Sequence, residues 1–248
     1  MKPLHPDWII PDWPAPPAVK AFITTRAGGV SQGAFTSFNL GLRAGDDTQA
    51  VAVNRERLRA LLPAEPKWLR QVHGAQVVDA DALTDVPEAD AAVARKPGTV
   101  CAVMVADCVP VLLADRAGTA VAVAHAGWRG LASGVVEKTI ARMALPPERL
   151  LAFLGPGIGP RAFEVGADVR DAFLARDPQS GEAFAPHAPG KWLANLFELA
   201  RRQLAAAGVA SIHGGGLCTH TDARRFYSYR RDRETGRMAA LIWIQRDE

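Results

Sequence analysis

Residues 100–126 read VCAVMVADCVPVLLADRAGTAVAVAHA. Three runs dense in Val, Ala and Leu lie within this stretch, at residues 100–105, 109–114 and 119–124. Such runs predict strands buried on both faces, because neither face carries the polar residues of a solvent-facing strand. The turn Asp115-Arg116-Ala117-Gly118 separates the last two runs and predicts a hairpin between them. The stretch therefore predicts the centre of a β-sheet.

Cys108 and His125 each stand at the end of one of these apolar runs. A thiol and an imidazole in such positions can serve as metal ligands or as a nucleophile and its base. His73 is a third candidate, and two histidines with one cysteine would leave a fourth position open on a catalytic zinc ion. The spacings form no local metal motif. On the residues alone, a metal site, a nucleophilic pair and ordinary buried side chains are all open interpretations.

Helices and strands are mixed along the rest of the chain without regular alternation. The predicted strands are residues 19–25, 68–72, 76–78, 150–154, 210–216 and 238–245. The predicted helices are residues 47–62, 131–143, 166–176 and 193–207. This mixture predicts an α+β fold rather than a doubly wound sheet. No repeat or linker divides the chain, so we expect residues 1–248 to form a single domain.

Composition excludes several classes of protein. The 248 residues are 48% hydrophobic, which is enough for a sizeable core. No apolar run approaches the ~20 residues that cross a bilayer, and the first residues do not resemble an export signal. With three cysteines and no such signal, we expect a cytoplasmic protein without a membrane partner. The net charge of +3 is small and spread out, so we expect no nucleic-acid partner.

Several arginines lie where they can bind an anion. Arg26 precedes the Gly28-Gly29 turn, Arg129 follows Trp128, and Arg230 follows an aromatic stretch. Glycine turns present backbone N–H groups and arginine adds a bidentate donor, a combination that suits phosphate. Trp128 can stack on an aromatic ligand, although packing explains it equally well. For each arginine taken singly, a solvated surface position is the alternative.

Eight segments, in the same order, resemble the laccase-domain or multicopper polyphenol oxidase family. Its members are now described as purine nucleoside phosphorylases and are linked to peptidoglycan editing. The matching segments are residues 24–31, 38–41, 71–74, 106–111, 125–130, 154–159, 163–166, and 228–232 with 235–238. They cover nearly the whole chain. One small departure is Gly157, where the family commonly has alanine.

The resemblance implies an activity, a metal and a fold. It implies phosphorolysis of adenosine, inosine and methylthioadenosine, and deamination of adenosine, with purine nucleosides and phosphate as the ligands. It implies that His73, Cys108 and His125 bind zinc, a site that copper can also enter. The implied fold has β-sheet layers flanked by helices and is similar to that of toxin-type cysteine hydrolases. The protein would be a monomer or a homodimer.

Further site residues follow from the resemblance together with the chemistry above. The catalytic candidates are Cys108, His125 and Asp107, with Asp107 as proton carrier and Glu164 as a second choice. The substrate-binding candidates are Arg26, Gly28, Gly29, Asn39, Trp128, Arg129 and Arg230. These assignments are expectations for the structure.

The multicopper part of the family name fails a chemical test on this chain. Multicopper oxidases hold their copper with many histidines, often in H-x-H pairs, whereas this chain has six histidines and no such pair. A single Cys/His site can hold one ion. Three alternatives to the purine enzyme are open: a Cys–His amidohydrolase that edits peptidoglycan precursors, a polyphenol oxidase with copper, and a binding protein without catalysis.

Overall fold

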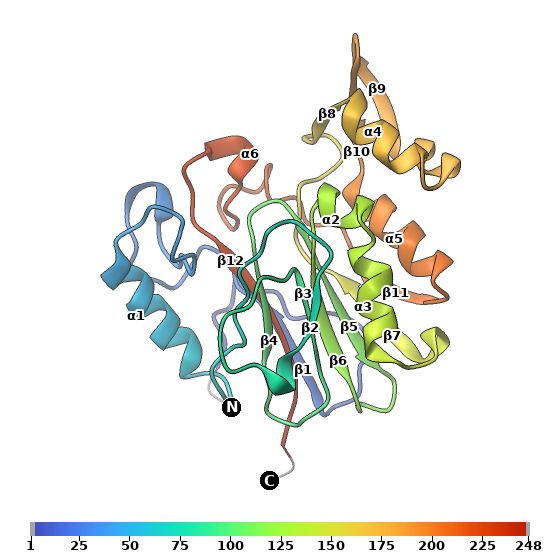
Figure 1. The fold of residues 1–248 in the computed structure, drawn as a ribbon. Coiled ribbons are helices and arrows are strands. Elements are labelled where there is room, and N and C mark those ends of the chain that lie inside the picture. Colours follow the sequence, from blue (N-terminus) through green and yellow to red (C-terminus); the bar gives the residue numbers. More distant parts are fainter. Residues whose placement is uncertain (1–2, 247–248) are drawn as a thin grey trace.

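The computed structural model describes residues 3–246, which form three β-sheets and the helices that cover them (Figure 1). The central sheet has six strands in the order β11-β7-β5-β6-β3-β2. Their bounds are β2 Val77–Asp79, β3 Ala91–Ala94, β5 Val109–Asp115, β6 Val121–Ala126, β7 Leu150–Leu154 and β11 Ser211–Gly214. β5 pairs antiparallel with both β6 and β7. The predicted hairpin is therefore confirmed, and it lies in the middle of the sheet.

A second sheet stacks on one face of the central sheet, and helices cover the remaining faces. The second sheet has the order β1-β12-β4, with bounds Val19–Ile23, Met238–Ile244 and Cys101–Val105. Alternate side chains of its strands, such as Val103 and Ile242, pack against Leu112 and Val123 of the central sheet. The opposite set packs toward α1 (Thr48–Arg59), through Leu58.

Helices α3 (Val135–Met143) and α5 (Leu196–Ala206) cover the other face of the central sheet. The layers therefore run helix, sheet, sheet, helix, with α1 on one side of Figure 1 and α3 and α5 on the other. The α+β prediction, with β-sheet layers flanked by helices, is confirmed. The expected similarity to toxin-type cysteine hydrolases stays a prediction.

A third, smaller sheet projects from these layers together with α4 (Ala167–Leu174) (Figure 1). Its order is β8-β10-β9, with bounds Glu164–Gly166, Lys191–Ala194 and Phe184–Ala188. These strands were not predicted from the sequence, because they are short and largely exposed and no apolar run marks them. The short turns of 3-10 helix are Gly33–Phe35, Ala80–Ala82, Pro147–Arg149 and Pro178–Ala183.

Two predicted elements differ from the structure near the candidate site. The predicted helix over 131–143 is two helices, α2 (Trp128–Ala132) and α3, because Gly134 has a left-handed backbone with φ of 80°. The predicted strand over 68–72 forms no regular ladder, since the Val72 N–H bonds to the carboxylate of Asp90.

A four-residue helix, α6 (Tyr229–Asp232), follows Ser228. Across residues 3–246, no helix has the length and apolar character needed to cross a membrane.

Candidate metal centre

The register of the central sheet places the candidate thiol beside the candidate imidazole. Cys108 immediately precedes β5, and His125 is the residue before the last of β6. Pro110 pairs with His125 in this hairpin, which sets Cys108 close to Gly127. A Cβ atom at Gly127 would lie 2.6 Å from the Sγ of Cys108. Glycine at this position therefore leaves the space that the thiol occupies.

His73 joins this pair from the loop that precedes β2. The ligand atoms of His73, Cys108 and His125 all lie within 4.8 Å of one another. His125 is buried, Cys108 is half-buried and His73 is exposed, so the cluster opens toward solvent on the His73 side. His73 has a φ of 60°, a left-handed conformation that is uncommon outside glycine. The structure thus brings together the three residues that the family resemblance implied as ligands.

Asp90, which was not among the residues predicted from the sequence, holds both histidines. Its buried carboxylate accepts the backbone N–H groups of Val72, His73 and Gly74 at 3.2, 2.9 and 2.7 Å. Its Oδ1 also lies 2.8 Å from the Nδ1 of His125. A metal-binding histidine commonly donates its second ring N–H to a carboxylate in this way. The contact leaves the Nε2 of His125 available to a metal ion.

The sequence did carry a signal for Asp90. It is the one charged residue in the apolar run 89–94, directly before β3. A carboxylate is costly to bury unless it is paired and hydrogen-bonded, so its place in such a run indicates strong partners. The partners themselves lie 16 to 35 residues away in the chain, and only the fold reveals them.

The charges of the cluster favour a thiolate at Cys108. Burial by itself raises the pKa of this thiol, but attraction to His125 and hydrogen bonds with His125 and His73 lower it below its ordinary value. Burial by itself lowers the pKa of His125, but the Cys108 thiolate and Asp90 raise this pKa above its ordinary value. The thiolate is the form of cysteine that binds metal ions and attacks electrophiles.

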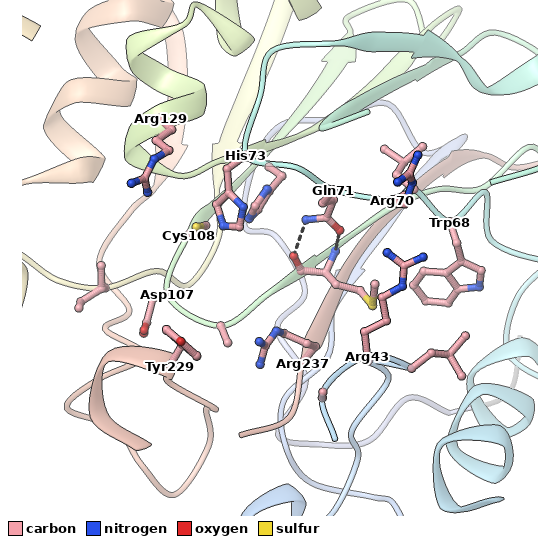
Figure 2. A pocket seen from close by; sticks show the side chains of 18 of the residues that line it. Arg43, Trp68, Arg70, Gln71, His73, Asp107, Cys108, Arg129, Tyr229 and Arg237 are labelled. Atoms are coloured by element: carbon pink, nitrogen blue, oxygen red, sulfur yellow. Dashed lines mark hydrogen bonds between the residues drawn. The ribbon is translucent and has the colours of Figure 1, made fainter. Parts of the chain in front are cut away.

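A cavity of about 820 Å³ opens beside the cluster (Figure 2). His73, Cys108 and His125 all line it. Phe163, Tyr229 and Ile158 add apolar or aromatic surface to its lining. This volume lies within the range of about 300–1,000 Å³ that is typical of small-molecule sites. The arrangement therefore exposes the cluster to a space that can hold a small molecule.

Asp107 also lines the cavity, with both of its carboxylate oxygens engaged. One oxygen accepts the hydroxyl of Thr219 and the other accepts the backbone N–H of Arg230, each at 2.7 Å. Asp107 has a φ of 103°, so this carboxylate connects three distant chain segments from a strained backbone position. Its role as proton carrier stays a prediction. Glu164, the second choice, lies outside the cavity lining, 3.6 Å from His187.

The structure separates the predicted substrate-binding residues into two groups. Arg129 and Arg230 line the cavity. Trp128 does not line it, but its ring centre lies 4.3 Å from the guanidinium carbon of Arg129. The members of the other group also lie outside the lining residues: Arg26, Gly28, Gly29 and Asn39.

The second group makes contacts that hold the chain together. Arg26 donates from Nε to the carbonyl of Thr36 at 2.7 Å and from a terminal nitrogen to that of Ala223 at 3.0 Å. The Oδ1 of Asn39 accepts the backbone N–H groups of Gly41 and Arg237. A Cβ at Gly29 would lie 2.1 Å from the carbonyl oxygen of Ser37. These contacts give Arg26, Asn39 and Gly29 structural roles.

Comparison with known proteins agrees with this fold and site. A protein of Neisseria meningitidis has a solved structure that matches with a TM-score of 0.94 at 52% identity, covering 97% of this chain and 100% of that one. The YlmD protein of Geobacillus stearothermophilus matches with a TM-score of 0.87 at 34% identity, covering 93% of each chain. Both are members of the structural class that this layered α+β fold defines.

The family follows from sequence similarity. Residues 20–245 match the family described as multi-copper polyphenol oxidoreductase laccase, and the chain belongs to this family. A purine nucleoside phosphorylase of Pseudomonas aeruginosa is 54% identical over 239 residues, covering 96% of this chain and 98% of that protein. The purine nucleoside phosphorylase YfiH of Escherichia coli is 53% identical over 242 residues, covering 95% and 98%. The family resemblance in the sequence is confirmed.

Proposed function

We propose that the protein is a zinc-dependent enzyme of purine nucleosides. It would phosphorolyse adenosine, inosine and methylthioadenosine, and it would deaminate adenosine. The relatives named purine nucleoside phosphorylase support the first activity. The observation that carries the proposal is the cluster of His73, Cys108 and His125 at the wall of a cavity large enough for a nucleoside.

The donor set fits zinc. Two imidazole nitrogens and one thiolate sulfur are ligands that zinc accepts, and three protein ligands leave the fourth position of a catalytic site open. Asp90 holds His125 in the orientation that metal-binding histidines usually show. When bound, zinc would supply a Lewis acid and lower the pKa of a water molecule to about 7. Copper can bind the same donors, but a single three-residue cluster offers no second copper position.

The residues around the cluster supply the other requirements of phosphorolysis. Phosphate has to lie next to the C1′ carbon while negative charge develops on the departing purine. Arg129 and Arg230 line the cavity with the cluster, and their planar guanidinium groups suit phosphate oxygens. Phe163 and Tyr229 offer aromatic surface on which a purine can stack. Asp107 is the carboxylate of the cavity lining, and we propose it as the group that moves the proton.

Replacing the thiol tests the proposal. Cys108→Ala should lose zinc and all turnover of adenosine while the protein stays folded, because the alanine cannot bind the metal. Cys218→Ser is a matched control, since the hydroxyl can still accept the Gly159 N–H that Cys218 accepts. Zinc content, circular dichroism and adenosine turnover with and without phosphate are the measurements. A zinc-free variant with full turnover would end the metal hypothesis.

One observation favours a second candidate, a Cys–His amidohydrolase that edits peptidoglycan precursors. Cys108, His125 and Asp90 have the relationship of a nucleophile, its base and the carboxylate that orients the base. Metal-stripped protein distinguishes the candidates, because the hydrolase would cleave a cell-wall precursor without zinc and the purine enzyme would lose its turnover. A protein that binds either ligand and turns over neither would be a binding protein.

A further inference from the structure

The cavity carries much more positive than negative charge. Six arginines line it: Arg43, Arg55, Arg70, Arg129, Arg230 and Arg237. Among the described residues, Asp107 is the one carboxylate of this lining, and both of its oxygens already accept hydrogen bonds. Within residues 3–246, Arg70 is the one arginine of the six whose guanidinium lies within 4.0 Å of a carboxylate, that of Glu88 at 2.7 Å. A concave surface with this charge attracts anions, and a neutral nucleoside does not balance it.

Arginines lie at both ends of the cavity, and Arg237 lies between them (Figure 2). Figure 2 shows Arg43, Trp68 and Arg70 on one side, and His73, Cys108 and Arg129 on the other. Gln71 lies between them, and its side-chain amide is fixed by two hydrogen bonds to the backbone of Met104, at 2.8 and 2.7 Å. A ligand that fills the cavity therefore extends from the metal centre to a second group of arginines.

The second group combines a fixed guanidinium with a free one. Arg55 donates from Nε to the carbonyl of Leu40 at 2.9 Å, and its guanidinium carbon lies 4.2 Å from the ring centre of Trp68. These contacts hold the guanidinium in place without neutralising it. Arg43 is exposed, and its side chain has no hydrogen-bond partner in the part of the chain that the structure describes. Arg43 and Arg55 thus have no carboxylate partner, whereas Arg70, the third arginine of this group, shares its charge with Glu88. Two unpaired guanidinium groups with a third beside them suit the oxygens of a phosphoryl group.

We propose that Arg43, Arg55 and Arg70 form a phosphoryl-binding subsite at the end of the cavity away from the metal centre. Purine nucleotides would then be ligands in addition to the nucleosides, with the base at the metal centre and the 5′-phosphate at this subsite. The assignment rests on the proposed function, because it takes the metal centre as the reacting end. Inorganic phosphate is the other source of the same chemistry. An attacking phosphate has to reach C1′, beside the base, where Arg129 and Arg230 are better placed.

Titration calorimetry on the full, zinc-loaded chain tests this subsite. The probes are adenosine 5′-monophosphate, adenosine and inorganic phosphate. We expect the monophosphate to bind at least tenfold more tightly than adenosine. Arg43→Gln and Arg70→Gln should each reduce this difference, and the double variant should abolish it, while adenosine affinity stays unchanged. Arg116→Gln is the matched control, because Arg116 is an exposed arginine of the β5–β6 turn, outside the cavity lining.

The outcomes separate the two sources and the two proposals. Arg43-dependent binding of inorganic phosphate, with equal affinities for the monophosphate and adenosine, would support the subsite and assign it to free phosphate. Equal affinities of the two adenosine compounds, with no effect of either substitution on phosphate, would overturn it. The proposed function is tested separately, by the adenosine turnover of Cys108→Ala. Loss of adenosine turnover there, with no effect at Arg43, would leave the proposed function standing without the subsite.

Discussion

Two buried carboxylates lie at opposite ends of the central sheet, one bound to a turn and an arginine and the other to the segments that carry the two histidines. Asp115, at the end of β5 that forms the hairpin turn, accepts the hydroxyl of Thr119 and pairs with Arg149 at 2.9 Å. Asp90, at the other end, accepts backbone N–H groups around His73 and contacts the ring of His125. Both side chains are fully buried. Burial and hydrogen bonding are thus similar for a structural carboxylate and for one that supports a site. The two are distinguished by which residues they contact.

Of changes to these two carboxylates, neutralising Asp90 should weaken the metal centre most. Asp90→Asn places an amide among three N–H donors and the His125 ring, so the histidines lose their common anchor. We expect metal affinity and turnover to fall by about 10- to 100-fold. Competition with a chelator, together with the zinc content of folded protein, measures the first. Asp115→Asn is the control, and its metal affinity should equal that of the wild type. Equal loss in both variants would contradict the division between the two ends.

A glycine at each of the same two ends of the sheet should respond differently to substitution. Gly127→Ala would bring a methyl group 2.6 Å from the Sγ of Cys108, so the thiol has to move and metal affinity should fall about tenfold. Gly118 lies in the turn with a φ of 72°, where alanine costs about 1–2 kcal/mol of stability. Urea unfolding and metal titration of both variants are the measurements. Weaker metal binding in Gly118→Ala, or unchanged metal binding in Gly127→Ala, would contradict the placement of the metal site at the Gly127 end alone.

The site end should also be the chemically reactive end. Interaction with His125 and His73 lowers the pKa of the Cys108 thiol, whereas burial, and then Asp81 and Asp79, raise that of Cys101. In metal-free protein at pH 7, iodoacetamide should therefore alkylate Cys108 at least about tenfold faster than Cys101. Mass spectrometry of tryptic peptides gives both rates. Zinc should protect Cys108, and labelling that zinc does not change would count against metal binding by this thiol.

Local pattern was sufficient for much of the fold. The apolar runs before and after residues 115–118 predicted the central hairpin, and periodicity predicted α1 and α5, because each of these elements buries an apolar face. The third sheet escaped prediction because its exposed strands carry no such pattern. The break before α3 depends on the left-handed backbone of Gly134, which the helical period of the surrounding residues does not show.

For the site, the sequence supplied residue types and the fold supplied neighbours. Cys108 and His125 were candidates from their strand ends and His73 was a third candidate, and the family resemblance implied that the three bind zinc. Asp90 was missed because its partners are distant in the chain. Arg26 and Arg129 look alike in sequence, each within two residues of a glycine, yet Arg26 donates to backbone carbonyls and Arg129 lines the cavity. Where an arginine side chain lies, and which groups it contacts, depends on tertiary structure that the neighbouring residues in the sequence do not reveal.

Asp115, at the hairpin-turn end of the sheet, should make a small and pH-dependent contribution to the free energy of unfolding. Burial alone raises the pKa of Asp115, but hydrogen bonds from Thr119, the backbone N–H groups of Ala117 and Thr119, and Arg149 hold it below its ordinary value. A lowered pKa in the folded state means that the stabilisation is present above the unfolded value of about 3.9 and is lost as the pH falls through the folded value. Asp115→Asn should thus lower the free energy of unfolding by about 1 kcal/mol at neutral pH.

That difference should shrink as the pH falls, because protonation of Asp115 removes from the wild type the charge that the variant already lacks. Urea unfolding of both proteins at neutral pH and near pH 3 measures the change. Metal-free protein is used for both, so that loss of metal in acid does not enter the comparison. A gap that stays constant over this range would mean that the charge of Asp115 contributes nothing. Its hydrogen bonds to the turn would then account for the whole of its contribution.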